Sequence, residues 1–419
     1  MRFLHTSDWH LGRTLEGRSR QDEQEEFSQE LCRLADDEKI DAVLVAGDVF
    51  DTFNPSSAAE QLFYDTLDQL AAGGRRAVVV IAGNHDSPER LVAASPLARR
   101  HGIVLLGLPD DQPPVAPGAG LDNVSVVLAG GASWLELAVP GCDHTAVILA
   151  LPYPSEARLG ELLQEPLDDE AALQQAYSAK IRRLFGRLTA NYRPDTVNIA
   201  MSHMFVQGGR TSDSERPVFS LGGANTVLPE DLPGGAQYVA LGHLHRPQAV
   251  SRRAAVCRYA GAPLAYSFSE AGQAKSVAVV DVQPGRPAVV REVPLTGGRP
   301  LVRWQAAEGL DQVYRWLDEG RDPRAWIDLE VTVGGPLSLQ EVHELRRACA
   351  RFVHIRAVYP ELQRDRQAES RAGLPVDQLF KRFYARKYGT EPDGQLVALF
   401  LEMLGEGGED RPEESDGLR

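Results

Sequence analysis

Short apolar runs that end abruptly in polar residues recur through the first two thirds of the chain. The clearest is Val78–Ala82, a β-branched run that is followed at once by Gly83 and Asn84. Runs of this kind are typical of buried strands, because β-branched side chains suit a pleated backbone that is covered on both faces. Four more strand-like runs lie at 3–7, 43–47, 197–202 and 238–242. Each is followed by Asp or His, so the pattern predicts strands whose carboxyl ends carry polar side chains.

Helical periodicity separates many of these strands. Apolar residues recur at helical spacing within 20–38, within a stretch from Ser56 to Gly73, and within 170–192. This alternation of strands and helices predicts an α/β fold with a mostly parallel, doubly wound sheet. Further strands are expected at 124–128, 146–151 and 277–282. The long polar loop 206–225 lies between two of the strands and is expected to face a substrate.

A change in composition at Gln283–Pro287 predicts the end of a first domain, 1–283. Residues 287–362 then form a small α+β domain. Its strands are expected at 289–293 and 327–333, and its helices at 310–317 and 339–352. Residues 373–405 form a pair of short helices whose apolar surface either packs on the body of the protein or docks on a partner. The remainder, 406–419, is acidic and is expected to be disordered.

Composition narrows the class of protein. The chain has 419 residues and a formal net charge of −15, so a nucleic-acid surface would have to be a local basic patch on an acidic body. No run is long and apolar enough to span a membrane, and the N-terminus lacks a signal-peptide pattern. The 4 cysteines are far apart in the sequence, which predicts reduced thiols and a cytoplasmic location.

The polar residues at the strand ends form a set of nitrogen and oxygen donors. They are Asp8, His10, Asp48, Asn84, His203, His243 and His245. This donor set favours Mn²⁺, Mg²⁺ or Fe²⁺ and leaves Zn²⁺ open. The set is too large for one catalytic ion that keeps an open position, whereas two ions that share a carboxylate fit it. Two ions about 3.5–4 Å apart suit a phosphoryl displacement. We expect Asp48 to be the shared carboxylate, because it follows the middle strand in sequence order.

Three neighbouring residues have expected roles beside the ions. His85 follows Asn84 directly and is expected to face the substrate, where it protonates or stabilises the leaving oxygen. Asp51 and Asp86 are expected to orient imidazoles from behind the ligands. A lone Asp-x-His or Asn-His-Asp sequence is more often a turn. It is the combination of five such motifs that indicates a catalytic site.

These motifs resemble those of the calcineurin-like metallophosphoesterases. They are Asp8-x-His10, Gly47-Asp48-x-x-Asp51, Gly83-Asn84-His85-Asp86, His203 and Gly242-His243-x-His245. Within that superfamily, the segments 4–12, 46–51 and 240–245 are similar to the SbcD family, the nuclease subunits of bacterial SbcCD complexes. The resemblance implies a sheet sandwich flanked by helices, with a capping, DNA-binding domain over 287–362.

The resemblance also implies a ligand set and an activity. It assigns Asp8, His10, Asp48 and His245 to one ion, and Asp48, Asn84, His203 and His243 to the other, with Mn²⁺ as the usual metal. The implied enzyme is a DNA nuclease in repair and recombination, an exonuclease on double strands and an endonuclease on single strands and hairpins. Its implied partners are DNA, an SbcC-type ATPase bound through residues 373–405, and a second copy in a homodimer, without a membrane.

Two other functions share the same motifs. A metallophosphoesterase for nucleotides or phosphoproteins would use the same ions but would not need the extra domain or the C-terminal helix pair. A non-catalytic scaffold of the same fold would be free to lose any ligand, so the intact set and His85 argue against it.

Overall fold

The computed structural model describes most of the chain, with gaps. The described residues are 1–116, 123–159, 170–215, 225–251, 256–359, 378–381, 384–385, 392–394, 396–397 and 399–400. The chain divides into two units, which are taken separately below. One consists of Met1–Val331 and Ser338–Arg356, and the other of Thr332–Leu337 and Ala357–Arg419.

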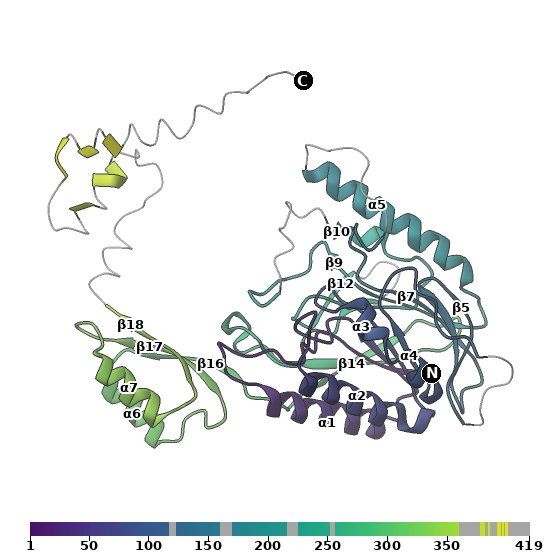
Figure 1. The fold of residues 1–419 in the computed structure, drawn as a ribbon, viewed down its shortest axis with the longest axis horizontal. Coiled ribbons are helices and arrows are strands. Elements are labelled where there is room, and N and C mark those ends of the chain that lie inside the picture. The colour runs from purple at the N-terminus through teal and green to yellow at the C-terminus, as the bar shows by residue number, and fades with distance from the viewer. Residues whose placement is uncertain are drawn as a thin grey trace, which may run out of the picture. The chain divides into compact units, whose positions relative to one another are not determined.

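Two β-sheets form the centre of the first unit (Figure 1). The first has the strand order β15-β14-β1-β2-β3-β4. Strands β1 to β4 are parallel to one another, whereas β14 pairs antiparallel with β1 and β15 pairs antiparallel with β14. Its strands are β1 Arg2–Thr6, β2 Ala42–Ala46, β3 Ala77–Ile81, β4 Ile103–Leu106, β14 Ser276–Asp281 and β15 Val289–Pro294.

The second sheet has the order β12-β13-β11-β8-β7-β6-β5, with β7, β8, β11 and β13 parallel and antiparallel strands towards its edges. Its strands are β5 Val126–Gly131, β6 Trp134–Ala138, β7 Ala146–Leu151, β8 Val197–His203, β11 Tyr238–Gly242, β12 Gln248–Ser251 and β13 Val256–Tyr259. A separate short pair joins β9 Phe205–Val206 to β10 Thr226–Val227.

The two sheets pack face to face, and helices cover their outer faces. Leu44 and Val79 of the first sheet share a core with Ile148 and Met201 of the second. Alternate residues of each strand point the other way, so the outer face of the first sheet packs on helices α1 and α2. The outer face of the second sheet packs on α5. The helices are α1 Gln21–Asp37, α2 Ser57–Ala71, α3 Pro88–Val92, α4 Ser95–Ala98 and α5 Glu170–Leu188.

This architecture confirms the expected sheet sandwich flanked by helices. The expectation of one doubly wound sheet, drawn from the alternation of strands and helices, is wrong, because the strands form two sheets. An apolar strand needs cover on both faces, but its sequence does not say whether a helix or a second sheet supplies that cover. Here each central strand has a helix on one side and the other sheet on its second side.

The first sheet also contains a strand that the sequence pattern places in the small domain. The strand expected at 289–293 is β15, which pairs antiparallel with β14 from Ser276 to Asp281. The Pro-Gly signal before it is a hairpin turn, in which the amide of Arg286 donates to the carbonyl of Gln283 at 3.1 Å. Gly285 has a φ of 67°, the left-handed conformation that the third residue of such a turn requires. The composition change at this point therefore marks a turn within the first sheet.

A smaller three-stranded sheet follows, in the order β16-β17-β18. Its elements are β16 Leu301–Ala306, α6 Leu310–Asp318, β17 Trp326–Thr332, α7 Leu339–Ala348 and β18 Phe352–Val358. Trp304 is its central core residue, in edge contact with Trp316 and Phe352. The α+β character expected for this region is as predicted, whereas the extent of the small domain, 287–362, remains a prediction.

Glutamates of α1 attach the segment before β16 to the body. Both oxygens of the buried Glu23 pair with the guanidinium of Arg20. Glu23 also accepts a hydrogen bond of 2.9 Å from the indole of Trp326 and one of 2.6 Å from the amide of Arg299. Two turns further on, Glu30 accepts the amides of residues 296 and 297.

The second unit is described only in parts. The rings of Phe380 and Phe400 stack with centroids 4.0 Å apart and planes inclined by 10°, so two helical segments touch there. Of the predicted helix pair 373–405, the structure describes 378–381, 384–385, 392–394, 396–397 and 399–400; its other residues, and all of the predicted acidic tail 406–419, lie outside the described residues. Among the described helices, we find none with the length and apolar composition that a membrane crossing requires.

Candidate metal centre

The five predicted loops meet at one edge of the sandwich. β1, β2 and β3 lead into three of them and β8 and β11 into the other two, so both sheets contribute. Because these strands are parallel within each sheet, their carboxyl ends lie on the same side. All the predicted ligands except the partly exposed Asn84 are buried.

One group of predicted ligands forms around His10. Asp8, His10 and His245 offer ligand atoms that all lie within 4.8 Å of one another. The Nε2 atoms of His10 and His245 are 3.0 Å apart. Asp8 accepts the amide of His243 at 3.0 Å and the hydroxyl of Ser7 at 2.5 Å, which fixes its carboxylate. Imidazole nitrogens and a carboxylate oxygen converge here, as a divalent cation requires.

A second group forms around Asn84. Its Oδ1 atom lies 2.9 Å from Nε2 of His203 and 3.0 Å from Nδ1 of His243, and these two nitrogens are 3.3 Å apart. Nδ1–H of His203 donates to the carbonyl of Ala46 at 2.9 Å. Nε2 of His203 therefore faces the cluster.

Asp48 lies between the two groups. Its Oδ2 atom is 3.7 Å from Nε2 of His10 and 3.4 Å from Nε2 of His203. Its Oδ1 atom accepts the amide of His85 at 2.8 Å. Asp8 is also close, because it forms a further group with Asp48 and His203 whose ligand atoms lie within 4.8 Å of one another. This position suits the shared carboxylate of a two-ion site.

The backbone at these positions is strained. φ is 55° at Asp8, 45° at His10, 51° at Asp48 and 108° at His243, all in the region that favours glycine. Such conformations cost of order 1–3 kcal/mol each and persist where the surroundings impose them, commonly at functional sites.

Glycines let the loops approach one another. A Cβ atom on Gly83 would lie 2.1 Å from Oδ1 of Asp48, and one on Gly242 would lie 1.8 Å from the carbonyl oxygen of Ala46. A Cβ on Gly47 would lie 2.4 Å from Nδ1 of His203. No side chain fits at these distances, which explains why a glycine precedes the polar residue in three of the motifs.

His85 lies against the cluster with one nitrogen anchored. Its Nδ1–H donates to the main-chain carbonyl of Asp51 at 2.7 Å. Nε2 is therefore the nitrogen that gains or loses a proton, and it lies 4.0 Å from Oδ2 of Asp48. The ring also makes an edge contact with His10, with centroids 4.7 Å apart.

Asp51 and Asp86 differ in what they face. Oδ1 of Asp51 lies 3.7 Å from Nδ1 of His10, so this carboxylate is near an imidazole. Asp86 instead accepts main-chain amides, those of Phe50 at 2.9 Å and Gly83 at 2.8 Å and that of residue 49. The carboxylate of Asp86 therefore ties two ligand loops together, and the expectation that it orients an imidazole does not match these contacts.

Burial and charge shift the pKa values of several of these groups. Burial raises the pKa of Asp8 to about 6 and lowers that of His243 to about 3. At His203 burial lowers the pKa, but the adjacent Asp48 carboxylate outweighs it and raises the pKa to about 9. A pKa above neutrality means that, without a metal ion, His203 holds a proton at neutral pH, which the Asp48 carboxylate 3.4 Å away stabilises. A cation at this position would replace the proton.

Sequence reasoning missed two supports of the centre. Arg158 donates to the carbonyls of Gly83 at 2.8 Å and Asp86 at 2.9 Å, which braces the loop that carries Asn84. Ser214 contacts the ring of His245, and Glu215 accepts a hydrogen bond of 2.8 Å from the main-chain amide of His245. The described start of loop 206–225 thus turns inward onto His245, while 216–224 lie outside the described residues. None of these residues belongs to a recognisable motif.

Comparison with known families agrees with this geometry. The family described as calcineurin-like phosphoesterase matches residues 1–247, and the family described as type 5 capsule protein repressor C-terminal domain matches residues 298–388. The chain is 50% identical over 404 residues to the SbcD subunit of the nuclease SbcCD from Bacillus subtilis (strain 168), covering 96% of this chain and 97% of that one. The chain belongs to the SbcD family.

Other SbcD relatives are more distant. The SbcD subunit from Escherichia coli (strain K12) is 30% identical, over 96% of this chain and 98% of that one. The SbcD subunit from Rhodobacter capsulatus is 35% identical, over 76% of this chain and 75% of that one. The match to the Escherichia coli subunit thus extends over nearly the whole chain, and the match to the Rhodobacter capsulatus subunit over about three quarters of it.

The family and the cluster together indicate a dimetal site. The donors are nitrogen and oxygen atoms, they come from both sheets, and a buried carboxylate lies between two groups of them. The residues present therefore fit two divalent cations.

Proposed function

We propose that this member of the SbcD family is a two-metal DNA nuclease that hydrolyses phosphodiester bonds. It would act in the cytoplasm, in DNA repair and recombination, as an exonuclease on double strands and an endonuclease on single strands and hairpins. The observation that carries the proposal is the position of Asp48, within 3.7 Å of one predicted ligand group and 3.4 Å of the other.

The proposed ligands divide into two sets that share Asp48. Asp8, His10 and His245 complete one set, and Asn84, His203 and His243 complete the other. Two bound ions would supply an activated water and neutralise the charge that develops on the phosphate. We propose Mn²⁺, with Mg²⁺ or Fe²⁺ as alternatives, because the donors are oxygen and imidazole nitrogen without a thiolate.

His85 is proposed as the general acid. Its anchored Nδ1–H leaves proton exchange to Nε2, which faces the cluster close to Asp48. A histidine is suited to this task because its pKa is ordinarily near neutral. Asp51 is proposed to support two imidazoles. Its main-chain carbonyl accepts the hydrogen bond from His85, and its carboxylate lies near the ring of His10. Asp86 supports the centre through the backbone.

The proposed partners are DNA, an SbcC-type ATPase and a second copy of the chain. The relatives are named as subunits of SbcCD, which supports a complex with an SbcC-type protein. Residues 373–405 are the proposed docking segment. Its described part holds Leu379 and Leu399, which are 38% and 52% exposed, so apolar surface is left for a partner.

A cleavage assay with matched substrates tests the proposal. The full chain, with an SbcC-type partner added, should degrade duplex DNA and open a DNA hairpin when Mn²⁺ is present, and should not do so with a chelator. A mononucleotide and a phosphopeptide are the control substrates. Hydrolysis of either control with both DNA substrates left intact would favour a general phosphoesterase instead. No hydrolysis of any substrate by a chain that binds metal would favour the scaffold.

A further inference from the structure

A buried chain of polar side chains runs from His245 away from the metal cluster. Oγ of Ser214 lies 2.6 Å from Nδ1 of His245 and 2.6 Å from Oε1 of Glu270. Lys275 pairs with Oε2 of Glu270. Ser214, Glu270 and His245 are 6%, 1% and 1% exposed. The order of contacts is therefore imidazole, hydroxyl, carboxylate and ammonium.

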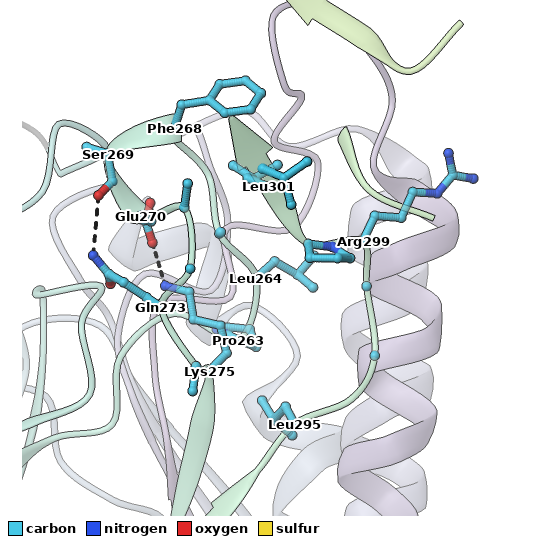
Figure 2. A pocket seen from close by; sticks show the side chains of 18 of the residues that line it. Pro263, Leu264, Phe268, Ser269, Glu270, Gln273, Lys275, Leu295, Arg299 and Leu301 are labelled. Carbon is cyan, nitrogen blue, oxygen red and sulfur yellow. Dashed lines mark hydrogen bonds and ion pairs between the residues drawn. The ribbon is translucent and has the colours of Figure 1, made fainter. Parts of the chain in front are cut away.

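Glu270 is built to stay an acceptor. Besides the hydroxyl of Ser214, its Oε1 atom accepts the amides of Tyr266 at 3.1 Å and Ser267 at 3.2 Å. Figure 2 shows Glu270 and Lys275 in contact on the wall of a cavity of about 990 Å³, opposite the segment that carries Arg299. None of the predicted metal ligands lines this cavity, so the cavity is distinct from the metal cluster.

The geometry determines the direction of each hydrogen bond. A carboxylate only accepts, and it is a stronger acceptor than the neighbouring hydroxyl of Ser212 at 2.7 Å, so the hydroxyl of Ser214 gives its proton to Glu270. The oxygen of Ser214 then has only lone pairs to offer His245, so Nδ1 of His245 must carry a hydrogen. Nε2 of the neutral ring consequently presents its lone pair, and it points into the cluster, 3.0 Å from Nε2 of His10.

We propose that Ser214 and Glu270 are positioning residues that hold His245 in the tautomer and orientation required to bind one of the two ions. The inference deepens the proposed function and rests on its two-metal site. Ligand imidazoles are commonly fixed through their second nitrogen, and loss of such a support typically costs about 10–100-fold in metal affinity. The effect should fall on the ion of Asp8 and His10, because the ring of His245 is assigned to that set alone.

A second buried serine provides a matched control. Ser178 is fully buried, donates to Oδ2 of Asp231 at 2.6 Å and accepts the amide of Leu228 at 2.8 Å. Its chemistry is the same as that of Ser214, but it lies on α5 and contacts none of the predicted ligands in the described hydrogen bonds. Any general cost of removing a buried hydroxyl should appear in both variants.

The test is a calorimetric Mn²⁺ titration of the full-length chain and its variants. In Ser214→Ala, one of two binding steps should weaken by about 10–100-fold while the other stays unchanged. Ser214→Thr keeps the hydroxyl and should restore the weakened step, and Ser178→Ala should titrate like the wild type.

Several results would overturn the inference. The first two are a Ser214→Ala chain that binds Mn²⁺ like the wild type, and a Ser214→Ala chain in which both binding steps weaken equally. The other two are a Ser214→Thr chain that binds Mn²⁺ as weakly as Ser214→Ala, and a Ser178→Ala chain that shows the same loss of affinity. The proposed function fails separately, if the wild-type chain binds two ions and leaves DNA intact. A wild type that cuts DNA beside an unaffected Ser214→Ala variant contradicts the positioning role alone.

Discussion

Replacing His85 by asparagine should separate proton transfer from metal binding. The carboxamide nitrogen of asparagine falls close to the position of Nδ1 in histidine, so it can keep the 2.7 Å bond to the carbonyl of Asp51. No atom of asparagine replaces Nε2, the nitrogen that lies 4.0 Å from Oδ2 of Asp48. The substitution therefore removes the proton donor and keeps its anchor.

The expected loss follows from the role. General-acid catalysis contributes about 10²–10⁴ in rate, which corresponds to about 3–5 kcal/mol of transition-state stabilisation. His85→Asn should lower the single-turnover cleavage rate of DNA by that factor, with Mn²⁺ content and DNA affinity unchanged. A bis-nitrophenyl phosphodiester should lose much less rate, because nitrophenolate leaves without a proton.

The exposed histidine at position 101 supplies the control. His101→Asn should cut both substrates at the wild-type rate, since that residue lies in a surface turn. The reasoning is refuted if His85→Asn loses a metal ion, or if it slows DNA and the nitrophenyl ester equally. In either case His85 would be a ligand or a structural residue.

Three further predictions concern the tail, the protons and the small domain. Deleting residues 373–419 should abolish co-purification with an SbcC-type partner and leave Mn²⁺ binding intact; retained association contradicts the docking segment. Mn²⁺ binding near pH 7.5 should release about one proton, because the pKa of His203 is about 9. The affinity for Mn²⁺ should therefore rise as the pH is raised towards 9. It should also drop once the pH falls below about 6, the pKa of Asp8, because that carboxylate is then protonated. Equal heats in buffers of different ionisation enthalpy would contradict this. Glu23→Ala should lower the free energy of unfolding by roughly 3–5 kcal/mol, since it leaves a buried guanidinium unpaired, whereas the exposed Glu26→Ala should change it by less than about 1 kcal/mol in urea melts.

The ligand positions were predictable because each ligand lies in a short loop that follows a strand-like run. A strand such as Val78–Ala82 can only be buried, and the polar residues after it must then sit at the end of a sheet. The glycines in the motifs carry the same information, since Gly83 and Gly242 admit no Cβ atom where the loops touch.

The supports of the centre were not predictable for the opposite reason. Ser214 and Glu270 are 56 residues apart and each is distant from the other ligand loops in sequence, so only the folded chain brings them to His245. Arg158 is a similar case, because it reaches main-chain carbonyls 72 and 75 residues away. Such contacts leave no periodic or local pattern.

The division into two sheets was not predictable, because an apolar strand does not show whether a helix or a second sheet covers each of its faces. The outer strands β6, β12 and β13 are short and mix polar with apolar residues, so they give a weak strand signal. The signal at Pro284-Gly285 suggests a domain boundary, although a tight turn within a sheet uses the same two residues.

The central claim is that one carboxylate, that of Asp48, holds two ions. Its most direct test is the Mn²⁺ content of purified wild type, Asp48→Ala and the surface control Asp65→Ala, measured by mass spectrometry after gel filtration. The wild type and Asp65→Ala should each carry two ions per chain, and Asp48→Ala should lose both. Two ions retained in Asp48→Ala, or a single ion in the wild type, would contradict the account.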